Sequence, residues 1–352
     1  MATTVTVQRT GAPRPRPADA ELGFGRYFTD HLFRADWTPA AGWGGARVVP
    51  YGALEMDPAV SALHYGQSIF EGLKAFPRPG GGLALFRPRA HAERFVHSAR
   101  RLAMPPIDPE LLLEGTRALL REDAGWMPSA PGTALYVRPV MFASEPFLGV
   151  RAAHSYTLLV FLTPVGGYFA EDRPLRLWVE RARARAARGG IGAAKASANY
   201  VASLLPAEEA KARGFDQVLW LDAAERRWLE EIGTMNVFVR VGDVLVTPPL
   251  SGTILAGVTR DSIITLARER GVAVEERPVA LEEVVAAHRA GRLTEVFGTG
   301  TAAVVSPIGE LAWEEDHLLL PQTGGIGAEL RDELTAIQRG ERADRHGWIE
   351  VV

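Results

Sequence analysis

The chain has 352 residues, a formal net charge of −3 and 47% hydrophobic residues, a size that predicts two globular domains and a composition that excludes wholesale disorder. It contains no cysteine, which excludes disulfides, thiolate metal sites and a cysteine nucleophile. No apolar run is long enough for a membrane span or a signal peptide, so we expect a cytoplasmic protein without a membrane partner. Only three of its 39 lysine and arginine residues are lysines, Lys74, Lys195 and Lys211, so any lysine chemistry has three candidates.

The first half of the chain alternates predicted strands and helices. Residues 1–20 are rich in Pro, Ala and Arg and lack hydrophobic periodicity, so we expect a flexible N-terminal arm. Residues 21–165 are expected to form a smaller N-terminal α/β domain. Periodicity and turn residues within it predict strands over 83–88, 134–142 and 155–165, and helices over 88–104 and 108–123. The strand over 155–165 is almost continuously apolar, which indicates a central position in its sheet.

The second half is predicted to form a larger domain. Residues 166–174, rich in Gly, Tyr and charge, are expected to be an interdomain loop, and residues 175–352 to be the second domain. We expect its strands over 175–182, 216–222, 235–248 and 273–279, and its helices over 200–213, 259–270, 281–290 and 326–339. Strands and helices mixed in two halves predict an α+β or mixed α/β fold.

Lys195 stands out among the lysines. It lies in the segment GGIGAAKASANY, where small side chains would let a planar ligand approach the amine closely. Partial burial there would favour the neutral, nucleophilic amine that a Schiff base requires. The plainer interpretation is a lysine in a flexible glycine loop. Lys74, with Glu71, is expected at the polar edge of a strand, and Lys211, three residues after Glu208, on a helix surface, so we assign neither a function.

A Schiff-base lysine implies pyridoxal phosphate or a carbonyl substrate, and this cofactor needs an acid at its pyridine nitrogen and a phosphate site. Glu230 and Glu231 stand ahead of a glycine turn and either could be the acid. A helix that follows a glycine and opens at Val258 or Thr259 would present free backbone N–H groups to a phosphate. A Gly-Thr-Gly-Thr turn at 298–301 is a second place where N–H and hydroxyl donors converge.

A run of arginines over 181–188 is the most basic segment of the chain. A compositional bias toward surface arginine is the plainer interpretation, and nucleic-acid binding is the alternative. The sequence pI of about 6.3 and the lack of interleaved aromatic residues disfavour that alternative, so we expect no nucleic-acid partner.

Six motifs together resemble those of a known family, in the same order and at similar intervals. They are LHYGQSIFEGLKAF, YVRPVMFASEPFLGV, GAAKASANYVASLLP, EEIGTMNVF, VTPPLSGTILAGVTRD and FGTGTAAVVSPI. From about Phe24 to its C-terminus the chain resembles the branched-chain amino-acid aminotransferases of the fold-type IV class of pyridoxal-phosphate enzymes. The resemblance implies a two-domain fold with a β-barrel-like core in the larger domain, pyridoxal 5′-phosphate as cofactor and no metal. It also implies a homodimer that transaminates Leu, Ile and Val with 2-oxoglutarate by a ping-pong mechanism.

The resemblance also implies cofactor-binding residues. Lys195 would be the Schiff-base lysine and the base that moves the substrate α-proton, and Glu231 would pair with the pyridine nitrogen. Tyr200 would bind the ring hydroxyl, and Arg94 would hold the phosphate as a charge-assisted pair. The remaining residues are Leu255 against the ring face, Val258 and Thr259 at the helix start, Thr301 with its hydroxyl, and Asn236 as a support behind the reacting groups.

The implied substrate-binding residues fall into three groups. Phe70, Tyr168 and Thr234 resemble the walls of an aliphatic side-chain pocket. Tyr136, Arg138 and the turn at Thr301 and Ala302 would handle substrate carboxylates, while Tyr65, Leu148 and Val150 would come from the neighbouring subunit.

The sequence departs from the family pattern in three places. Ser197 and Ala198 replace smaller residues and add bulk beside the cofactor, and Ala256 replaces a proline, which loosens the turn before the phosphate-binding helix. Ala303 and Ser306 stand where some animal members carry a thiol pair, which excludes redox control of that kind.

Four alternatives remain open at this point. The chain could be another fold-type IV enzyme, namely a D-amino-acid aminotransferase or an aminodeoxychorismate lyase, although the YVRP and EIGTMN segments disfavour both. It could be a pathway-specialised aminotransferase for an unusual aliphatic amino acid. A catalytically silent binding protein is disfavoured because Lys195, Tyr200 and Glu231 are all intact.

Overall fold

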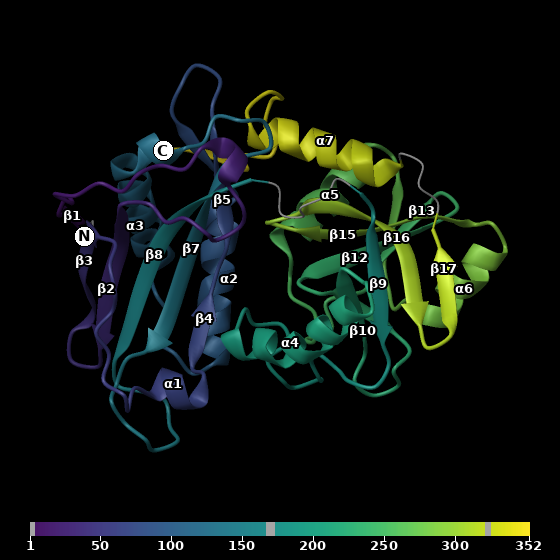
Figure 1. The fold of residues 1–352 in the computed structure, drawn as a ribbon, viewed down its shortest axis with the longest axis horizontal. Helices are drawn as coiled ribbons and strands as arrows, with labels where there is room; N and C mark the ends of the chain where they lie inside the picture. Colours follow the sequence, from purple (N-terminus) through teal and green to yellow (C-terminus); the bar gives the residue numbers. More distant parts are fainter. Residues whose placement is uncertain (1–3, 167–172, 321–324) are drawn as a thin grey trace. The chain divides into compact units, whose positions relative to one another are not determined.

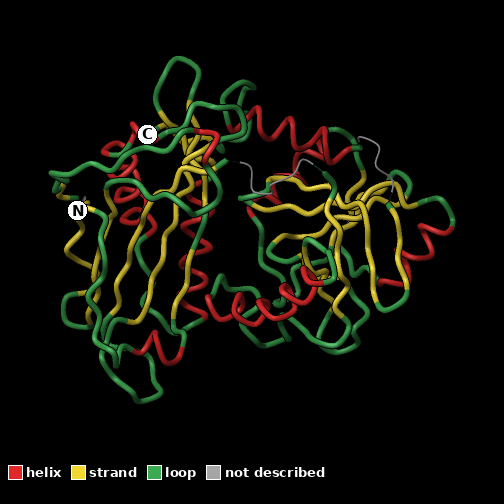
Figure 2. The backbone as a smooth tube through the Cα atoms, viewed as in Figure 1, coloured by secondary structure: helices red, strands yellow, loops and turns green. Residues whose placement is uncertain are grey.

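A computed structural model describes residues 4–166, 173–320 and 325–352, and the chain divides into two compact units (Figure 1). Unit 1 comprises Met1–Tyr168, Ala194–Ala198 and Ile337–Val352, and unit 2 comprises Phe169–Ala193 and Asn199–Ala336. Both units combine helices with sheets (Figure 2). The predicted interdomain loop over 166–174 lies mostly outside the described residues, so the predicted domain limits stay a prediction.

Unit 1 is built on one nine-stranded sheet of order β1-β3-β2-β8-β7-β5-β6-β18, with β4 paired to β7 beside this path. Its strands are β1 (Thr6–Val7), β2 (His31–Thr38), β3 (Gly42–Pro50), β4 (Ser68–Phe70), β5 (Leu73–Pro77), β6 (Leu83–Phe86), β7 (Ala134–Ala143), β8 (Tyr156–Val165) and β18 (Ile349–Val351). The apolar strand predicted over 155–165 is β8. It pairs with β2 on one side and β7 on the other and is almost wholly buried, which confirms its central position.

Helices α2 (Pro88–Arg101) and α3 (Pro109–Glu122) pack on this sheet, and the short α1 (Ser61–Tyr65) lies near β7. Both longer helices begin with a proline, whose fixed φ suits the first helical position. Asp108 caps α3, because its carboxylate accepts the backbone N–H of Glu110. These signals make the helix starts predictable from the sequence.

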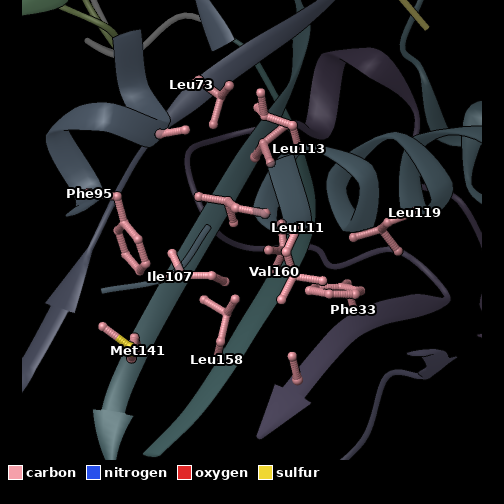
Figure 3. Close-up of a cluster of buried hydrophobic side chains, with 14 of the residues drawn as sticks. Phe33, Leu73, Phe95, Ile107, Leu111, Leu113, Leu119, Met141, Leu158 and Val160 are labelled. Atoms are coloured by element: carbon pink, nitrogen blue, oxygen red, sulfur yellow. The ribbon is translucent and has the colours of Figure 1, made fainter. Parts of the chain in front are cut away.

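The core of unit 1 lies between α3 and the sheet. Figure 3 shows Leu111 and Leu119 of α3 close to Phe33 of β2 and Val160 of β8. A Cβ at Gly115 of α3 would lie 2.5 Å from the Phe33 ring, so only glycine lets the helix approach the strand this closely. This packing holds the strands that carry the side chains of the candidate site.

Unit 2 contains a closed six-stranded barrel. Strands follow the order β11-β10-β9-β16-β15-β12, and an additional pairing of β11 with β12 closes the ring. The ring strands are β9 (Leu175–Glu180), β10 (Gln217–Leu221), β11 (Leu229–Ile232), β12 (Met235–Val241), β15 (Leu293–Gly300) and β16 (Val304–Trp313). Strands β13 (Val244–Thr247), β14 (Ala273–Glu276) and β17 (Asp316–Leu319) extend it, and the helices are α4 (Ser197–Ala212), α5 (Val258–Glu269), α6 (Leu281–Arg289) and α7 (Ile326–Gln338). The predicted mixed α/β class and β-barrel-like core are confirmed.

Two sequence-based expectations about elements need correction. The stretch 235–248 is not one strand but the hairpin β12–β13. Glu71 and Lys74, expected at the polar edge of a strand, are 0% and 8% exposed. Lys74 lies on β5, which pairs with β6 and β7 on its two sides, so this strand has no free edge. Burial lowers the pKa of Lys74 to about 8. Lys211 is exposed, as expected.

Residues 4–20, the described part of the predicted arm, contact unit 1 at several points. Strand β1 pairs with β3 in parallel. The backbone N–H of Arg14 donates to the Asp30 carboxylate at 2.7 Å, and Asp19 accepts the N–H of Ala130 at 2.7 Å. This segment therefore has defined partners in the structure.

Among the described residues, no helix combines the length and the apolar character that a membrane crossing requires. The same residues contain no group of three or more His, Asp or Glu side chains placed to hold a metal ion.

Candidate active site

Two hydrogen bonds hold the main chain of Lys195 in unit 1. Its N–H donates to Ser98 Oγ of α2 at 2.9 Å, and its carbonyl accepts the N–H of Phe70 of β4 at 3.0 Å. Ala196, the next residue, forms a bridge with Ile69 of the same strand. The Lys195 ammonium nitrogen lies 5.0 Å from the centre of the Phe70 ring. The lysine is therefore not in a loose glycine loop, because a helix and a strand both hold its main chain.

Three buried ionisable side chains, Glu71, His91 and Arg94, form a cluster close to Lys195, and His91 and Arg94 belong to α2. Arg94 Nε donates to Glu71 Oε1 at 2.6 Å, its Nη2 donates to Glu71 Oε2 at 2.9 Å, and His91 Nδ1 lies 3.0 Å from Glu71 Oε2. Burial alone would raise the pKa of Glu71, but Arg94 and His91 outweigh it and hold that pKa well below its usual value. Burial, the main cause, lowers the pKa of His91, and the charges of Arg94 and Lys195 act in the same direction. Glu71 thus stays ionised and orients the predicted phosphate-binding arginine.

Tyr136 and Arg138 lie two residues apart on β7 and so share one face of the sheet. Arg138 Nη2 lies 3.4 Å from the Tyr136 hydroxyl, and its guanidinium carbon lies 4.7 Å from the centre of the Phe70 ring. A Cβ at Gly72 would lie 1.6 Å from the Tyr136 hydroxyl, so glycine is required there. Arg138 Nε is buried without a hydrogen-bond partner among the described residues. An anion such as a carboxylate would satisfy that donor.

The residues predicted to serve a neighbouring subunit are on the surface of unit 1. Tyr65, Leu148 and Val150 are 46%, 59% and 85% exposed. Tyr65 donates its hydroxyl hydrogen to the carbonyl of Leu148, so two of the three lie together. Tyr65 belongs to α1, and Leu148 and Val150 lie in the loop after β7.

In unit 2 the Glu231 carboxylate of β11 is held at both oxygens. The N–H of Leu255 donates to Glu231 Oε1 at 2.7 Å, and Arg185 Nε lies 3.2 Å from Glu231 Oε2. The Arg185 and Glu231 side chains are 7% and 5% exposed. Arg185 also donates to the carbonyl of Thr253. At this position the arginine run is not a surface feature, because Arg185 is a buried counter-ion of the predicted pyridine-binding carboxylate.

Three neighbouring strands of the barrel place polar residues in one row. Glu231 of β11 pairs with Asn236 of β12, which pairs with Thr299 of β15, and directly paired residues share a face of the sheet. Asn236 Nδ2 donates to the carbonyl of Leu255 at 3.0 Å. The Thr299 hydroxyl is buried and has no hydrogen-bond partner in the part of the chain that is described. This row ends next to the turn at 301–303, where the predicted Thr301 and Ala302 are half-buried.

Helix α5 begins at Val258 beside this row, as predicted. Its N-cap is Gly257, which has no side chain to satisfy the first N–H groups of the helix. A Cβ at Gly257 would lie 2.0 Å from Asn236 Oδ1, so the amide and the glycine fit closely together. A helix start with a glycine N-cap, followed by Thr259, is suited to a phosphate.

The other predicted residues are placed as follows. Tyr200 and Leu255 are half-buried, Thr234 is exposed in the turn after β11, and Tyr168 lies outside the described residues. Of the departures, Ser197 donates to Ser68 Oγ of β4 at 3.2 Å, and Ala198 and Ala256 are exposed.

Sequence reasoning missed several supporting residues. They are Glu71, His91 and Ser98 in unit 1, and Arg185 and Thr299 in unit 2. One signal was present: a functional arginine or glutamate in a buried position requires an opposite charge. The sequence contains such charges nearby, but it does not show which of them pair.

Similarity to known proteins extends along nearly the whole chain. Residues 68–311 match the family model described as amino-transferase class IV. Branched-chain-amino-acid aminotransferase 2 of Bacillus subtilis (strain 168) is 47% identical over 352 residues, which cover 99% of this chain and 97% of that protein. The structure of the Escherichia coli branched-chain amino acid aminotransferase is 27% identical with a TM-score of 0.76, covering 91% of this chain and 98% of the other. The T.th. branched-chain amino acid aminotransferase with pyridoxamine 5′-phosphate is 28% identical with a TM-score of 0.73, covering 90% and 97%.

Proposed function

Because this chain belongs to the class IV aminotransferase family, we propose how its residues divide the work of transaminating branched-chain amino acids. The chain is a branched-chain-amino-acid aminotransferase that depends on pyridoxal phosphate, and the prediction made from its six motifs is confirmed. The roles of single residues, the acceptor 2-oxoglutarate, the ping-pong order, a homodimer and a cytoplasmic location are proposals.

The described residues fit the cofactor. Glu231 presents a fixed charge for a pyridine nitrogen, the glycine-capped start of α5 suits a phosphate, and the buried Thr299 hydroxyl needs a hydrogen-bond partner. When bound, pyridoxal phosphate supplies a ring that withdraws electrons from the substrate α-carbon. We assign the ring nitrogen to Glu231, the ring hydroxyl to Tyr200, the ring face to Leu255, and the phosphate to Arg94, Val258, Thr259 and Thr301.

Lys195 Nζ is the proposed base. Lys195 would hold the cofactor until a substrate amine takes its place, and its free amine would take the substrate α-proton and return it on the way to the 2-oxo acid. Ser98 and Phe70 hold the lysine main chain, so the side chain moves from a fixed point. This fixed main chain is the observation that carries the assignment, because a proton carrier must return to the same place.

Substrate carboxylates are assigned to Arg138, Tyr136 and the turn at Ala302. The unpartnered Arg138 Nε and the adjacent Tyr136 hydroxyl support this assignment, and they would let 2-oxoglutarate enter the same pocket as an aliphatic amino acid. Phe70, Thr234 and Tyr168 are the proposed walls of the side-chain pocket. The exposed Tyr65, Leu148 and Val150 support a homodimer in which each chain completes its partner's pocket.

A panel of amino donors with 2-oxoglutarate tests the proposed function. L-leucine, L-isoleucine and L-valine should be converted and D-alanine should not. Lys195→Ala should lower turnover by about 10³-fold or more and remove the absorption band of the lysine-bound cofactor. Lys211→Ala, which changes an exposed lysine, is the matched control and should behave as the parent protein. Full activity of the Lys195→Ala enzyme on L-leucine would contradict the assignment of Lys195 as the base.

A further inference from the structure

Unit 2 contains a pocket of about 580 Å³ that none of the assigned cofactor or substrate residues lines. Its volume lies in the range of small-molecule sites, roughly 300–1,000 Å³. Trp228, Ile254, Pro248 and Pro278 supply apolar wall. The pocket is therefore large enough and apolar enough for the body of a small organic ligand.

A buried carboxyl group forms part of this pocket. Glu230 follows Leu229 in β11, and because neighbouring residues of a strand face opposite sides, it faces away from Glu231. Its side chain is 5% exposed, and Oε2 has no hydrogen-bond partner among the described residues. Burial raises the pKa of Glu230, while a hydrogen bond with Thr253 and the charge of Arg185 oppose the rise. An unsatisfied buried carboxyl oxygen costs free energy that a ligand with an N–H donor would recover.

The charged residues around the pocket determine whether a cation or an anion is favoured as its ligand. The lining contains three acidic residues, Glu230, Asp222 and Glu225, and one basic residue, Arg188. Asp222 already accepts backbone N–H groups, including those of Trp228 and Glu225, so its charge is fixed in place. An anion would be repelled by this set, whereas a cation is attracted.

We propose that this pocket is a binding site for a small organic ammonium ion with an apolar body, held by an N–H bond to Glu230 Oε2 and by contact with Trp228 and Ile254. The site is distinct from the reaction site. It shares one segment with it, because Thr253 and Ile254 run directly into Leu255, whose N–H holds Glu231. On the proposed role of Glu231, an ion bound here acts on catalysis through that segment, which makes the pocket an effector site.

The test uses a probe that does not react with the cofactor as a primary amine does. N-methylcyclohexylamine is titrated into the holoenzyme by calorimetry, and cyclohexanol and cyclohexanecarboxylate serve as neutral and anionic probes of similar shape. We expect the cation to bind at least about tenfold more tightly than either control, since hydrogen bonds to charged groups are the stronger ones. Equal affinities for the three probes would overturn the proposal.

Two variants locate the probe. Glu230→Gln should weaken binding of the cation about tenfold, whereas Glu225→Gln, at the exposed rim, should change it less than about threefold. Equal loss in both variants would contradict the assignment to Glu230. If Glu230→Gln does not fold, the parent enzyme decides: the cation should bind more tightly as the pH rises through the raised pKa of Glu230, and a flat profile would overturn the proposal.

Competition and turnover separate this site from the reaction. 4-Methylvalerate, an aliphatic carboxylate without an ammonium group, should not displace the probe, and displacement would place the probe in the reaction site and overturn the proposal. Turnover of L-leucine is measured in the same samples. A probe-dependent change of at least about twofold, absent in Glu230→Gln, supports the effector role, and an unchanged turnover with bound probe refutes that role. Because turnover without the probe tests the proposed function, the two failures are distinguishable.

Discussion

The two units each contain a buried carboxylate–arginine pair, and the pairs differ in which member faces the chemistry. In unit 1, Arg94 Nε lies 2.6 Å from Glu71 Oε1, and the arginine is the proposed phosphate ligand. In unit 2, Arg185 lies 3.2 Å from Glu231, and the carboxylate is the proposed partner of the pyridine nitrogen. In the proposed assignment, the functional member of the pair is the cation in unit 1 and the anion in unit 2.

The carboxylate of each pair also has a further hydrogen-bonding group. Glu71 is supported by a second group, His91, and Glu231 by the N–H of Leu255. A buried ion without its partner is strongly unfavourable, so in each unit the supporting member stabilises the functional one. On the proposed roles, catalysis and folding depend on the same contacts in both units.

Loss of the functional carboxylate should have the largest effect. Glu231→Gln keeps the shape of the side chain but removes the charge at the pyridine nitrogen, and we expect the kcat for L-leucine to fall about 10³-fold. Glu230→Gln, one residue earlier and facing the other way, is the control and should lower kcat less than twofold when no ammonium probe is present. Steady-state assays of both proteins measure this, and similar losses would show that the charge at Glu231 has no special role.

Loss of the supporting carboxylate in unit 1 should act mainly on stability. Glu71→Gln leaves Arg94 buried without a counter-ion, which should lower the free energy of unfolding by about 3–5 kcal/mol in urea titrations of the apoenzyme. Glu110→Gln removes a half-exposed partner of Arg117 and Arg89 and should cost less than about 1 kcal/mol. A loss below 1 kcal/mol in Glu71→Gln would mean that Arg94 does not depend on Glu71.

The pH dependence of stability should distinguish these proteins further. The pKa of Glu71 is lower in the folded chain than its usual value of 4.5, so unfolding takes up a proton at pH values between the two. The contribution of Glu71 is fully present above pH 4.5 and is lost as the pH falls through the folded-state pKa. The difference in unfolding free energy between the parent and Glu71→Gln should therefore be constant near pH 7 and shrink below pH 4.5. A difference that grows in acid would contradict the ion pair.

Loss of the supporting arginine in unit 2 should be milder, because the N–H of Leu255 still holds one oxygen of Glu231. We expect Arg185→Gln to lower kcat for L-leucine about tenfold and to shift the pH dependence of the cofactor absorption, with KM little changed. Arg183→Gln, which breaks a half-exposed pair with Glu209 in the same arginine run, should leave all three unchanged. Equal effects of the two variants would show that Arg185 has only a structural role.

The same pairs show how much of the site was predictable from sequence. The family resemblance implied roles for Glu231, which stands in the motif EEIGTMNVF, and for Arg94, which lies outside the six motifs, so both were named without the structure. Glu71 and Arg185 were missed because each pairs with a residue far along the chain, and local patterns carry no information on such pairing. Glu71 was even assigned to a polar edge, since alternation along a strand indicates a face but not what covers it.

The fold was predictable to a similar extent. Caps and periodicity located α2, α3 and α5, where local signals act within one turn. Closure of the barrel depends on the pairing of β11 with β12, and only the family resemblance predicted it. The row of Glu231, Asn236 and Thr299 follows from strand register, which composition and periodicity do not determine.

We expect the smallest effect from the loss of an uncharged contact, which serves as a reference for the two ion pairs. Ser197 donates to Ser68 in unit 1, and no ion depends on that bond. Ser197→Ala should lower the free energy of unfolding by about 0.5–1.5 kcal/mol and change the kcat for L-leucine less than twofold, because its hydroxyl is bonded to β4. A double-mutant cycle with Ser68→Ala isolates the bond, and its coupling energy should not exceed the loss in the single variant. A large change in kcat would instead mean that the departure at Ser197 acts on the cofactor directly.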